Sequence, residues 1–180
     1  MRKQRAPQEW FDQVEVLMQR ERYGEAITLL RRHGTEAKND WRHTWTWGWC
    51  YFQIDNFQAA KVHLRRATQL APDSPACHGA FGTACLQAGN YRVAEKSLRK
   101  ALALKDSYLA RICLALTYME VGKLEEAEQV HLQGIALRPD SAKRHKAYAD
   151  FLYDVGRKKE ERQVRRTARE IARKQKQVAK

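Results

Sequence analysis

One spacing recurs along most of the 180-residue chain. Small residues follow it with steps of 34, 34 and 33, at Ala26, Ala60, Ala94 and Ala127. Large side chains repeat with the same steps, at Tyr23, Phe57, Tyr91 and Leu124. Glycines follow it later in the chain, at Gly89, Gly122 and Gly156. Three independent series with one period indicate an array of structural repeats, each of which packs against its neighbours.

Each repeat contains two helical patterns separated by a short polar break. In residues 41–53, apolar or small residues recur at helical spacing, at Thr44, Trp47, Gly48 and Tyr51. In residues 57–70 a second helical face is formed by Ala60, Leu64, Ala67 and Leu70. The breaks of the later repeats contain the glycine series, and glycine favours the left-handed conformation that ends a helix. The sequence therefore predicts helix–turn–helix repeats.

Three repeats, the second, third and fourth, carry a longer shared motif, which the fourth forms with Leu114, Ala115, Tyr118, Gly122, Ala127 and Pro139. In the second repeat it is formed by Trp47, Gly48, Tyr51, Ala60, Leu64, Ala67 and Pro72. In the third it is formed by Phe81, Gly82, Cys85, Gly89, Tyr91, Ala94, Leu98 and Ala101. This motif resembles that of the tetratricopeptide repeat (TPR) family, over roughly residues 7–170. The resemblance implies an all-α, right-handed superhelical solenoid of helix–turn–helix repeats that ends in a C-terminal capping helix.

The repeat boundaries predict the organisation of the chain. Residues 1–6 form a basic N-terminal extension, 7–174 a single TPR domain, and 175–180 a flexible basic tail. The repeats span about 7–40, 41–74, 75–107, 108–141 and 142–174. Glu161 occupies an alanine position of the motif, which suits a terminal repeat without a successor. His131 and Gly134 replace a large apolar residue and an alanine, so we expect looser packing there.

The resemblance also implies a concave binding face, lined by the first helix of each repeat. On this chain we expect a peptide groove formed by Phe11, Met18, Trp45, Trp49, Phe52, Leu86, Ile112, Leu116, Met119 and Tyr153. Trp47 and Tyr51 belong to the opposite, core-facing stripe of their helix. Because aromatic patches often mark interaction sites, we predict a non-enzymatic scaffold that binds a protein or peptide. The alternative is that neighbouring helices, or a second copy of the chain, cover Trp45 and Trp49.

Positive charge is concentrated near the C-terminus. The chain has a formal net charge of +13, and residues 156–180 contribute eleven basic and three acidic side chains. We expect a basic surface formed by Lys143, Lys146, Arg162, Arg165, Arg166, Arg169 and Arg173. It fits a solvated capping helix, a nucleic-acid-associated arm, or a helix that docks on an acidic protein or anionic membrane. The segment lacks aromatic residues for base stacking and for membrane insertion.

The sequence contains no convergent set of catalytic groups. The six histidines are scattered over the repeats, and no phosphate-binding loop, HExxH motif or nucleophile elbow is present. We therefore expect no enzymatic activity, no cofactor and no metal. The four cysteines form no CxxC pair, which favours reduced thiols. Because the chain also lacks an apolar leader and a membrane-spanning stretch, we expect a cytoplasmic protein.

Overall fold

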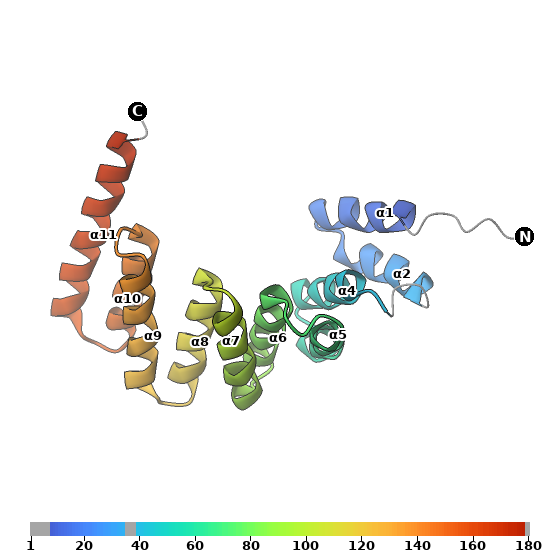
Figure 1. Cartoon of the computed structure of the whole chain (residues 1–180), viewed down its shortest axis with the longest axis horizontal. Helices are drawn as coiled ribbons and strands as arrows, with labels where there is room; N and C mark the ends of the chain where they lie inside the picture. Colours follow the sequence, from blue (N-terminus) through green and yellow to red (C-terminus); the bar gives the residue numbers. More distant parts are fainter. Residues whose placement is uncertain (1–7, 35–38, 179–180) are drawn as a thin grey trace, which may run out of the picture. The chain divides into compact units, whose positions relative to one another are not determined.

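The computed structural model describes residues 8–34 and 39–178, and these residues form helices and turns without a strand. The predicted helices at 41–53 and 57–70 are confirmed, since α4 and α5 have those bounds. The helices pair in chain order (Figure 1) as α1 (Gln8–Gln19), α2 (Tyr23–Arg32), α4 (Trp41–Gln53), α5 (Phe57–Leu70), α6 (Pro75–Gln87), α7 (Tyr91–Leu104), α8 (Tyr108–Glu120), α9 (Leu124–Leu137), α10 (Ala142–Asp154) and α11 (Lys158–Val178). The expected N-terminal extension lies outside the described residues.

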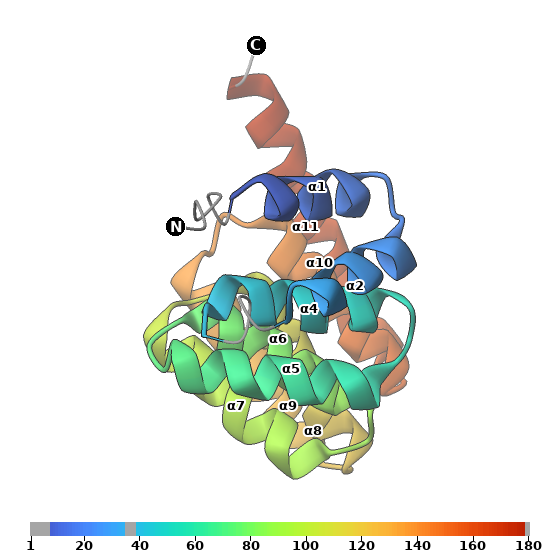
Figure 2. The ribbon, with the colours of Figure 1, turned by 90° about the vertical axis from the view of Figure 1, so that its right-hand side faces the viewer.

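The chain divides into two compact units, residues 1–105 and residues 106–180. In the first unit α4 packs against α5 and α6 against α7, and α5 also contacts α6, the first helix of the next pair. Figure 2 shows α4 and α5 running side by side. In the second unit α8 packs against α9 and α10 against α11, with α9 contacting α10. Both units therefore repeat one arrangement, in which helix pairs stack on each other.

Small residues let the two helices of a pair approach closely. The four alanines of the 34-residue series are completely buried. A side chain added at Gly48 would place its Cβ 2.6 Å from Cγ of Leu64. The same distance separates a Cβ at Gly82 from Cγ of Leu98, one repeat later. The repeated glycine and leucine thus form one interlocking contact in two successive helix pairs.

The turns between paired helices share one conformation. Five residues at equivalent positions adopt positive φ angles between 57° and 80°, namely Glu21, Asp55, Gly89, Gly122 and Gly156. This is the left-handed region, where glycine avoids the steric cost of a Cβ atom. The first helices of three pairs, α4, α6 and α8, begin with a capping side chain. For example, the side chain of Ser74 accepts a hydrogen bond from the backbone of Cys77 at 3.3 Å.

The last helix is longer than predicted. Helix α11 continues to Val178, so residues 175–178 are helical rather than a flexible tail. Gln175 helps to hold this end, since its amide donates a hydrogen bond to the carbonyl of Asp140 at 2.8 Å. Glu161, at the alanine position, is buried and forms an ion pair with Arg165 on the same helix. The acidic side chain is therefore accommodated by a neighbouring arginine.

Candidate interaction site

Three aromatic rings form a ladder along one side of α4, which we call the aromatic ladder (Trp45, Trp49 and Phe52). The rings of Trp45 and Trp49 are stacked, with centroids 5.7 Å apart and planes 5° apart. Those of Trp49 and Phe52 are stacked at 5.3 Å and 10°. The spacing of four and then three residues places the rings on one helix face. The three groove residues that the sequence places on this helix therefore stack on one another.

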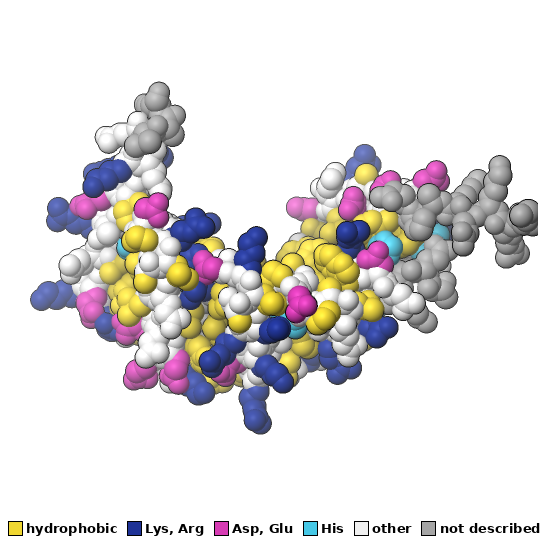
Figure 3. Space-filling model, viewed as in Figure 1, with side chains coloured by type: hydrophobic (Ala, Val, Ile, Leu, Met, Phe, Trp, Pro, Cys, Tyr) yellow, Lys and Arg dark blue, Asp and Glu magenta, His cyan; other side chains and the backbone are white. Residues whose placement is uncertain are grey.

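The aromatic ladder is anchored at both ends but remains partly exposed. Trp45 and Phe52 pack against a cluster of Ala60, Leu64 and Ala84, contributed by α5 and α6. All three rings of the ladder are half-buried, so each keeps accessible surface. In Figure 3, hydrophobic side chains gather on the surface below α1, where α4 and α6 lie. The ladder is thus a fixed apolar surface that the helices of its own unit cover only in part.

The opposite face of α4 differs from the expected core stripe. Trp47 and Tyr51 are half-buried, and both stack on His63 of α5, with centroid distances of 4.4 Å and 5.4 Å. Burial lowers the pKa of His63. The fully buried positions belong instead to smaller neighbours, such as Gly48 and Cys50. A hollow of about 480 Å³ beside this stack is lined by Asn39, Thr44, Trp47, Val62, His63, Arg65, Arg66 and Gln69.

The other predicted groove residues of the first unit contribute less surface. Leu86 is buried, with 7% of its surface exposed. Phe11 and Met18 of α1 are half-buried and pack against the core of the first helix pair. The ring of Phe11 lies 4.3 Å from that of His43. The aromatic ladder therefore forms the most prominent part of the predicted groove in this unit.

The remaining groove residues belong to the second unit. Leu116 of α8 and Tyr153 of α10 are exposed, with 41% and 61% of their surfaces accessible. Ile112 and Met119 of α8 are half-buried. Leu116 and Met119 are three residues apart and share one side of α8. The second unit thus exposes apolar side chains of its own.

Two family models match the chain. One, described as anaphase-promoting complex, cyclosome, subunit 3, matches residues 19–101. The other, described as tetratricopeptide repeat, matches residues 113–144. Both are tetratricopeptide repeat families. The chain is a tetratricopeptide repeat protein. In general terms it is therefore an all-α solenoid and a protein-interaction scaffold, as predicted from the sequence.

Solved structures show the same fold in other TPR-like proteins. The crystal structure of MamA has a TM-score of 0.76 and 19% identity, and the match covers 91% of this chain and 96% of that one. For MamA from residue 41 to its end, from Desulfovibrio magneticus RS-1, these values are 0.77, 19%, 92% and 94%. A structure of MamA AMB-1 has a TM-score of 0.72 and 22% identity, and the match covers 92% of this chain and 98% of that one. No match was found among curated protein sequences.

The last TPR places the predicted basic surface on two helices. Lys143 and Lys146 of α10 are exposed, and the Lys143 ammonium lies 4.9 Å from the centre of the Tyr108 ring. The exposed arginines of α11 are Arg162, Arg166, Arg169 and Arg173. Arg165 differs, because it is half-buried and pairs with Asp150 at 3.0 Å and with Glu161. The ion pair with Asp150 therefore joins Arg165 to α10, while Glu161 belongs to the same helix as Arg165.

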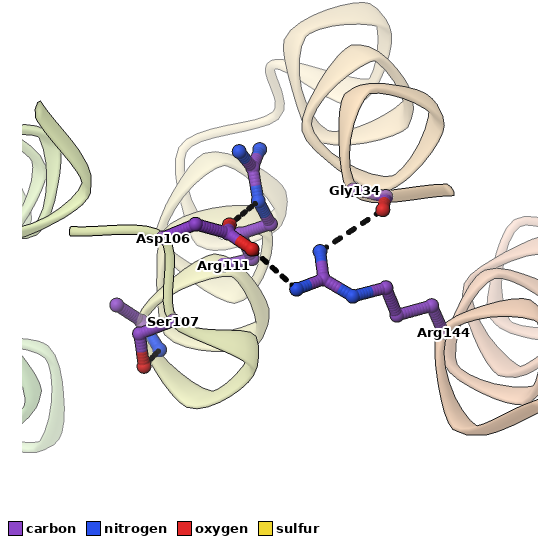
Figure 4. Close-up of polar contacts among 6 residues, drawn as sticks. Asp106, Ser107, Arg111, Gly134 and Arg144 are labelled. Atoms are coloured by element: carbon purple, nitrogen blue, oxygen red, sulfur yellow. Dashed lines mark hydrogen bonds and ion pairs between the residues drawn. The ribbon is translucent and has the colours of Figure 1, made fainter. Parts of the chain in front are cut away.

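The structure corrects the expectation of loose packing at Gly134 of the fourth TPR. The guanidinium of Arg144, which is 8% exposed, fills the space beside this glycine and donates a hydrogen bond to its carbonyl at 3.0 Å (Figure 4). Arg144 also pairs with Asp106 at 2.5 Å, and Arg111 binds the other oxygen of that carboxylate at 2.7 Å. Burial would raise the pKa of Asp106, but the hydrogen bonds from both arginines outweigh it and lower the pKa.

The residues that contact Arg144 occupy regular positions of the repeat, but their contact was not predicted from the sequence. Gly134 stands one repeat after Ala101, and Arg144 stands one repeat after Ala110. A smaller residue on α9 thus accompanies a larger residue on α10, which keeps the volume between the helices filled. Asp106 stands where the flanking repeats have a proline, at Pro72 and Pro139. The contact could have been predicted from the sequence, because Gly134 and Arg144 both differ in size from the alanines at the equivalent positions of the previous repeat.

A second buried polar group lies in the fourth TPR. His131 occupies the place of Leu64 and Leu98 in earlier repeats and is 9% exposed. Its ring lies 5.3 Å from that of Phe151 and 6.1 Å from that of Tyr148. Burial lowers the pKa of His131 to about 4, so the ring is neutral at pH 7. His131 therefore packs as a core residue.

Metal sites and membrane-spanning helices are absent from the residues that the structure describes. Within them, no group of three histidine, cysteine, aspartate or glutamate side chains is placed to hold a metal ion. None of the described helices combines the length and apolar character that a bilayer-crossing segment needs. The four cysteines are buried and form no disulfide bond with one another. Burial raises the pKa of Cys50 to about 12 and that of Cys85 to about 11. These thiols are therefore protonated at pH 7.

Proposed function

We propose that the chain binds a peptide or a helix of a partner protein on the face of α4 that carries the aromatic ladder. The stacked, half-exposed rings of Trp45, Trp49 and Phe52 are the observation that carries this proposal. Tryptophan is strongly enriched among the residues that dominate binding energies at protein interfaces. Contact between the rings and helices α5 and α6 reduces the entropy lost when a ligand binds.

The dimensions of the aromatic ladder suit a short ligand segment. Seven residues separate Trp45 from Phe52, which is about 10 Å along the helix axis. That length corresponds to two turns of a helical ligand or to three residues of an extended one. Gln53 at the end of the ladder is exposed and accepts or donates hydrogen bonds, and its amide already donates one to Tyr23 at 3.1 Å. A ligand therefore meets apolar rings and a polar rim, as interface sites generally provide.

A second candidate function rests on the basic helix α11. Its exposed arginines favour association with nucleic acid or with an acidic surface, which would make the chain an assembly protein that acts through its last helix. This function does not involve the aromatic ladder. The two functions can therefore be tested separately on one chain.

The first function can be tested by selecting ligands from a phage-displayed library of random twelve-residue peptides. We expect the immobilised chain to enrich peptides that carry large apolar side chains. The variant Trp45→Ala/Trp49→Ala should bind the enriched peptides about 1,000-fold more weakly, because each tryptophan anchor contributes about 2 kcal/mol.

The matched control is Val62→Ala/Leu132→Ala, which also truncates two exposed apolar residues. It should bind the enriched peptides as the parent does. Equal binding by the tryptophan variant and the parent would show that the aromatic ladder is not the binding surface. Circular dichroism of both variants would establish that the helices are retained.

A further inference from the structure

The outer side of α11 carries an unbroken line of basic side chains, which we call the basic stripe. Its members are exposed and spaced alternately three and four residues apart, at Lys159, Arg162, Arg166, Arg169, Arg173 and Lys176. At about 100° per residue they fall within about 100° of the helix circumference. Lys158 and Gln177 are the other residues of α11 in that sector, so it contains no acidic side chain. Figure 3 shows Lys and Arg side chains standing out along α11, at the left edge of the view.

The side of α11 opposite the basic stripe packs against α10, so the stripe faces solvent. Ala168 is buried, and Val164 and Ile171 are half-buried, on the side that packs against α10. The contact of Gln175 with Asp140 extends this packing along the helix. The basic stripe is therefore held outward on a helix that is supported along its length, over about 26 Å from Lys159 to Lys176.

The acidic residues of α11 leave most of the stripe unneutralised. Glu160 pairs with Arg157, and Glu161 pairs with Arg165, neither of which belongs to the stripe. Glu170 pairs with Arg166 at 3.0 Å, but this contact is exposed to solvent. Among the described residues, the other five members of the stripe have no ion-pair partner. A row of like charges about 5 Å apart is electrostatically unfavourable until a polyanion binds it.

Of the possible polyanions, duplex DNA fits the observations best. Exposed pairs with carboxylates contribute little, whereas binding to phosphates releases counterions condensed on the nucleic acid. Single strands are usually held by aromatic stacking, and α11 contains no aromatic residue. The wide major groove of B-DNA admits an α-helix, but the deep, narrow major groove of duplex RNA does not.

We propose that the basic stripe of α11 binds the phosphate backbone of duplex DNA without sequence selectivity. This inference rests on the second candidate function and names its ligand. The six side chains of the stripe are all lysines and arginines, whose charge binds phosphates whatever the base sequence. The six positions neutralise up to six phosphates along one edge of the helix.

The test measures binding of the full chain to a fluorescein-labelled 20-base-pair duplex by anisotropy, between 50 and 200 mM NaCl. We expect log K to fall with log salt concentration with a slope of about −5, from six phosphate contacts. The variant Arg162→Gln/Arg166→Gln/Arg169→Gln/Arg173→Gln should reduce the slope to about −2 and weaken binding at 50 mM NaCl by about 10,000-fold. Glutamine keeps a similar helix propensity, so the helix should remain folded.

The matched control, Arg65→Gln/Arg92→Gln/Lys96→Gln/Lys100→Gln, removes the same charge from exposed positions of α5 and α7. It should retain the affinity and slope of the parent. Equal losses in both variants would show that net charge, not the stripe, drives binding, and absence of DNA binding would also overturn the proposal. Equal or tighter binding to duplex RNA would contradict the choice of DNA.

Two further probes separate this inference from the function on which it rests. They are a helical peptide rich in glutamate and vesicles that contain phosphatidylserine. If the stripe binds either probe but not DNA, the DNA proposal fails and the second candidate function stands. If it binds none of them, both fail. The aromatic-ladder variant should bind DNA as the parent does, so the first function is judged independently.

Discussion

Gly48 and Gly82, each in the first helix of its pair, act by their lack of a side chain. A Cβ at Gly82 would lie 2.6 Å from Leu98 Cγ and 3.2 Å from the Leu98 backbone nitrogen, so α6 and α7 would have to separate. We expect Gly82→Ala to lower the free energy of unfolding by about 1–3 kcal/mol in urea titrations. Gly79→Ala in the same helix is the control, because its Cβ would meet only Ala101 at 4.0 Å.

The control should be neutral or stabilising by up to about 1 kcal/mol, because alanine favours the helix more than glycine does. If both alanine variants unfold at the same urea concentration, the close contact between Gly82 and Leu98 does not limit the approach of the helices.

A single buried histidine makes the second unit sensitive to pH. The pKa of His131 is about 4 in the folded chain because burial disfavours its charged form, against an ordinary value of 6.5. Between these two values the unfolded chain binds more protons, so stability falls as the pH is lowered from 6.5 toward 4. Because of this residue alone, the free energy of unfolding should fall by about 2 kcal/mol between pH 7.5 and pH 5.

His131→Leu restores the residue type found at Leu64 and Leu98 and removes this titration. The variant should lose about 2 kcal/mol less than the parent between the two pH values in denaturant titrations. Identical pH dependence of variant and parent would show that His131 is not the responsible group.

At the scale of the helix pair, the turn conformation sets where the first helix ends. Gly122 has a φ of 74°, and a Cβ built there has no atom within 4 Å. A side chain at this position would therefore strain the backbone conformation but would not clash with a neighbour. We expect Gly122→Ala to lower the free energy of unfolding by about 1 kcal/mol, and therefore to lower the melting temperature. Gly122→Asn should cost less, because asparagine tolerates the left-handed region. Equal melting temperatures for both variants would contradict this explanation.

Helices were predictable where local pattern and repeat spacing agreed. Both determine α4 and α5, whose bounds are those predicted. The end of α11 was not predictable in this way. Its last turn lacks a continuing apolar stripe and is held by a contact between Gln175 and Asp140, 35 residues apart. A tertiary hydrogen bond of this kind leaves no periodic pattern in the sequence.

At the scale of the whole chain, the repeat spacing identified the fold and the aromatic ladder, but not the burial of every predicted residue. Leu86 is buried, whereas Trp47 of the expected core stripe keeps exposed surface beside His63. Burial depends on the side chains of neighbouring repeats, which vary independently. For the same reason the sequence pattern at Gly134 predicts loose packing, although Arg144 fills the space beside it.

The two proposed surfaces differ in chemistry, so salt should weaken ligand binding at one of them and leave binding at the other almost unchanged. The aromatic ladder acts through apolar contact, which salt screens little, whereas the basic stripe acts through charge. Raising the salt concentration should therefore release DNA from the chain while a peptide stays bound. This contrast makes salt dependence a direct readout of which surface holds a given partner.

The most direct test of the central claim is isothermal titration of a selected peptide at 50 and 500 mM NaCl. We expect similar affinity at both salt concentrations for the parent, and a loss of about 30-fold for Trp49→Ala alone. Val62→Ala should match the parent at both concentrations. Unchanged affinity in Trp49→Ala, or loss of peptide binding at 500 mM NaCl, would contradict binding at the aromatic ladder.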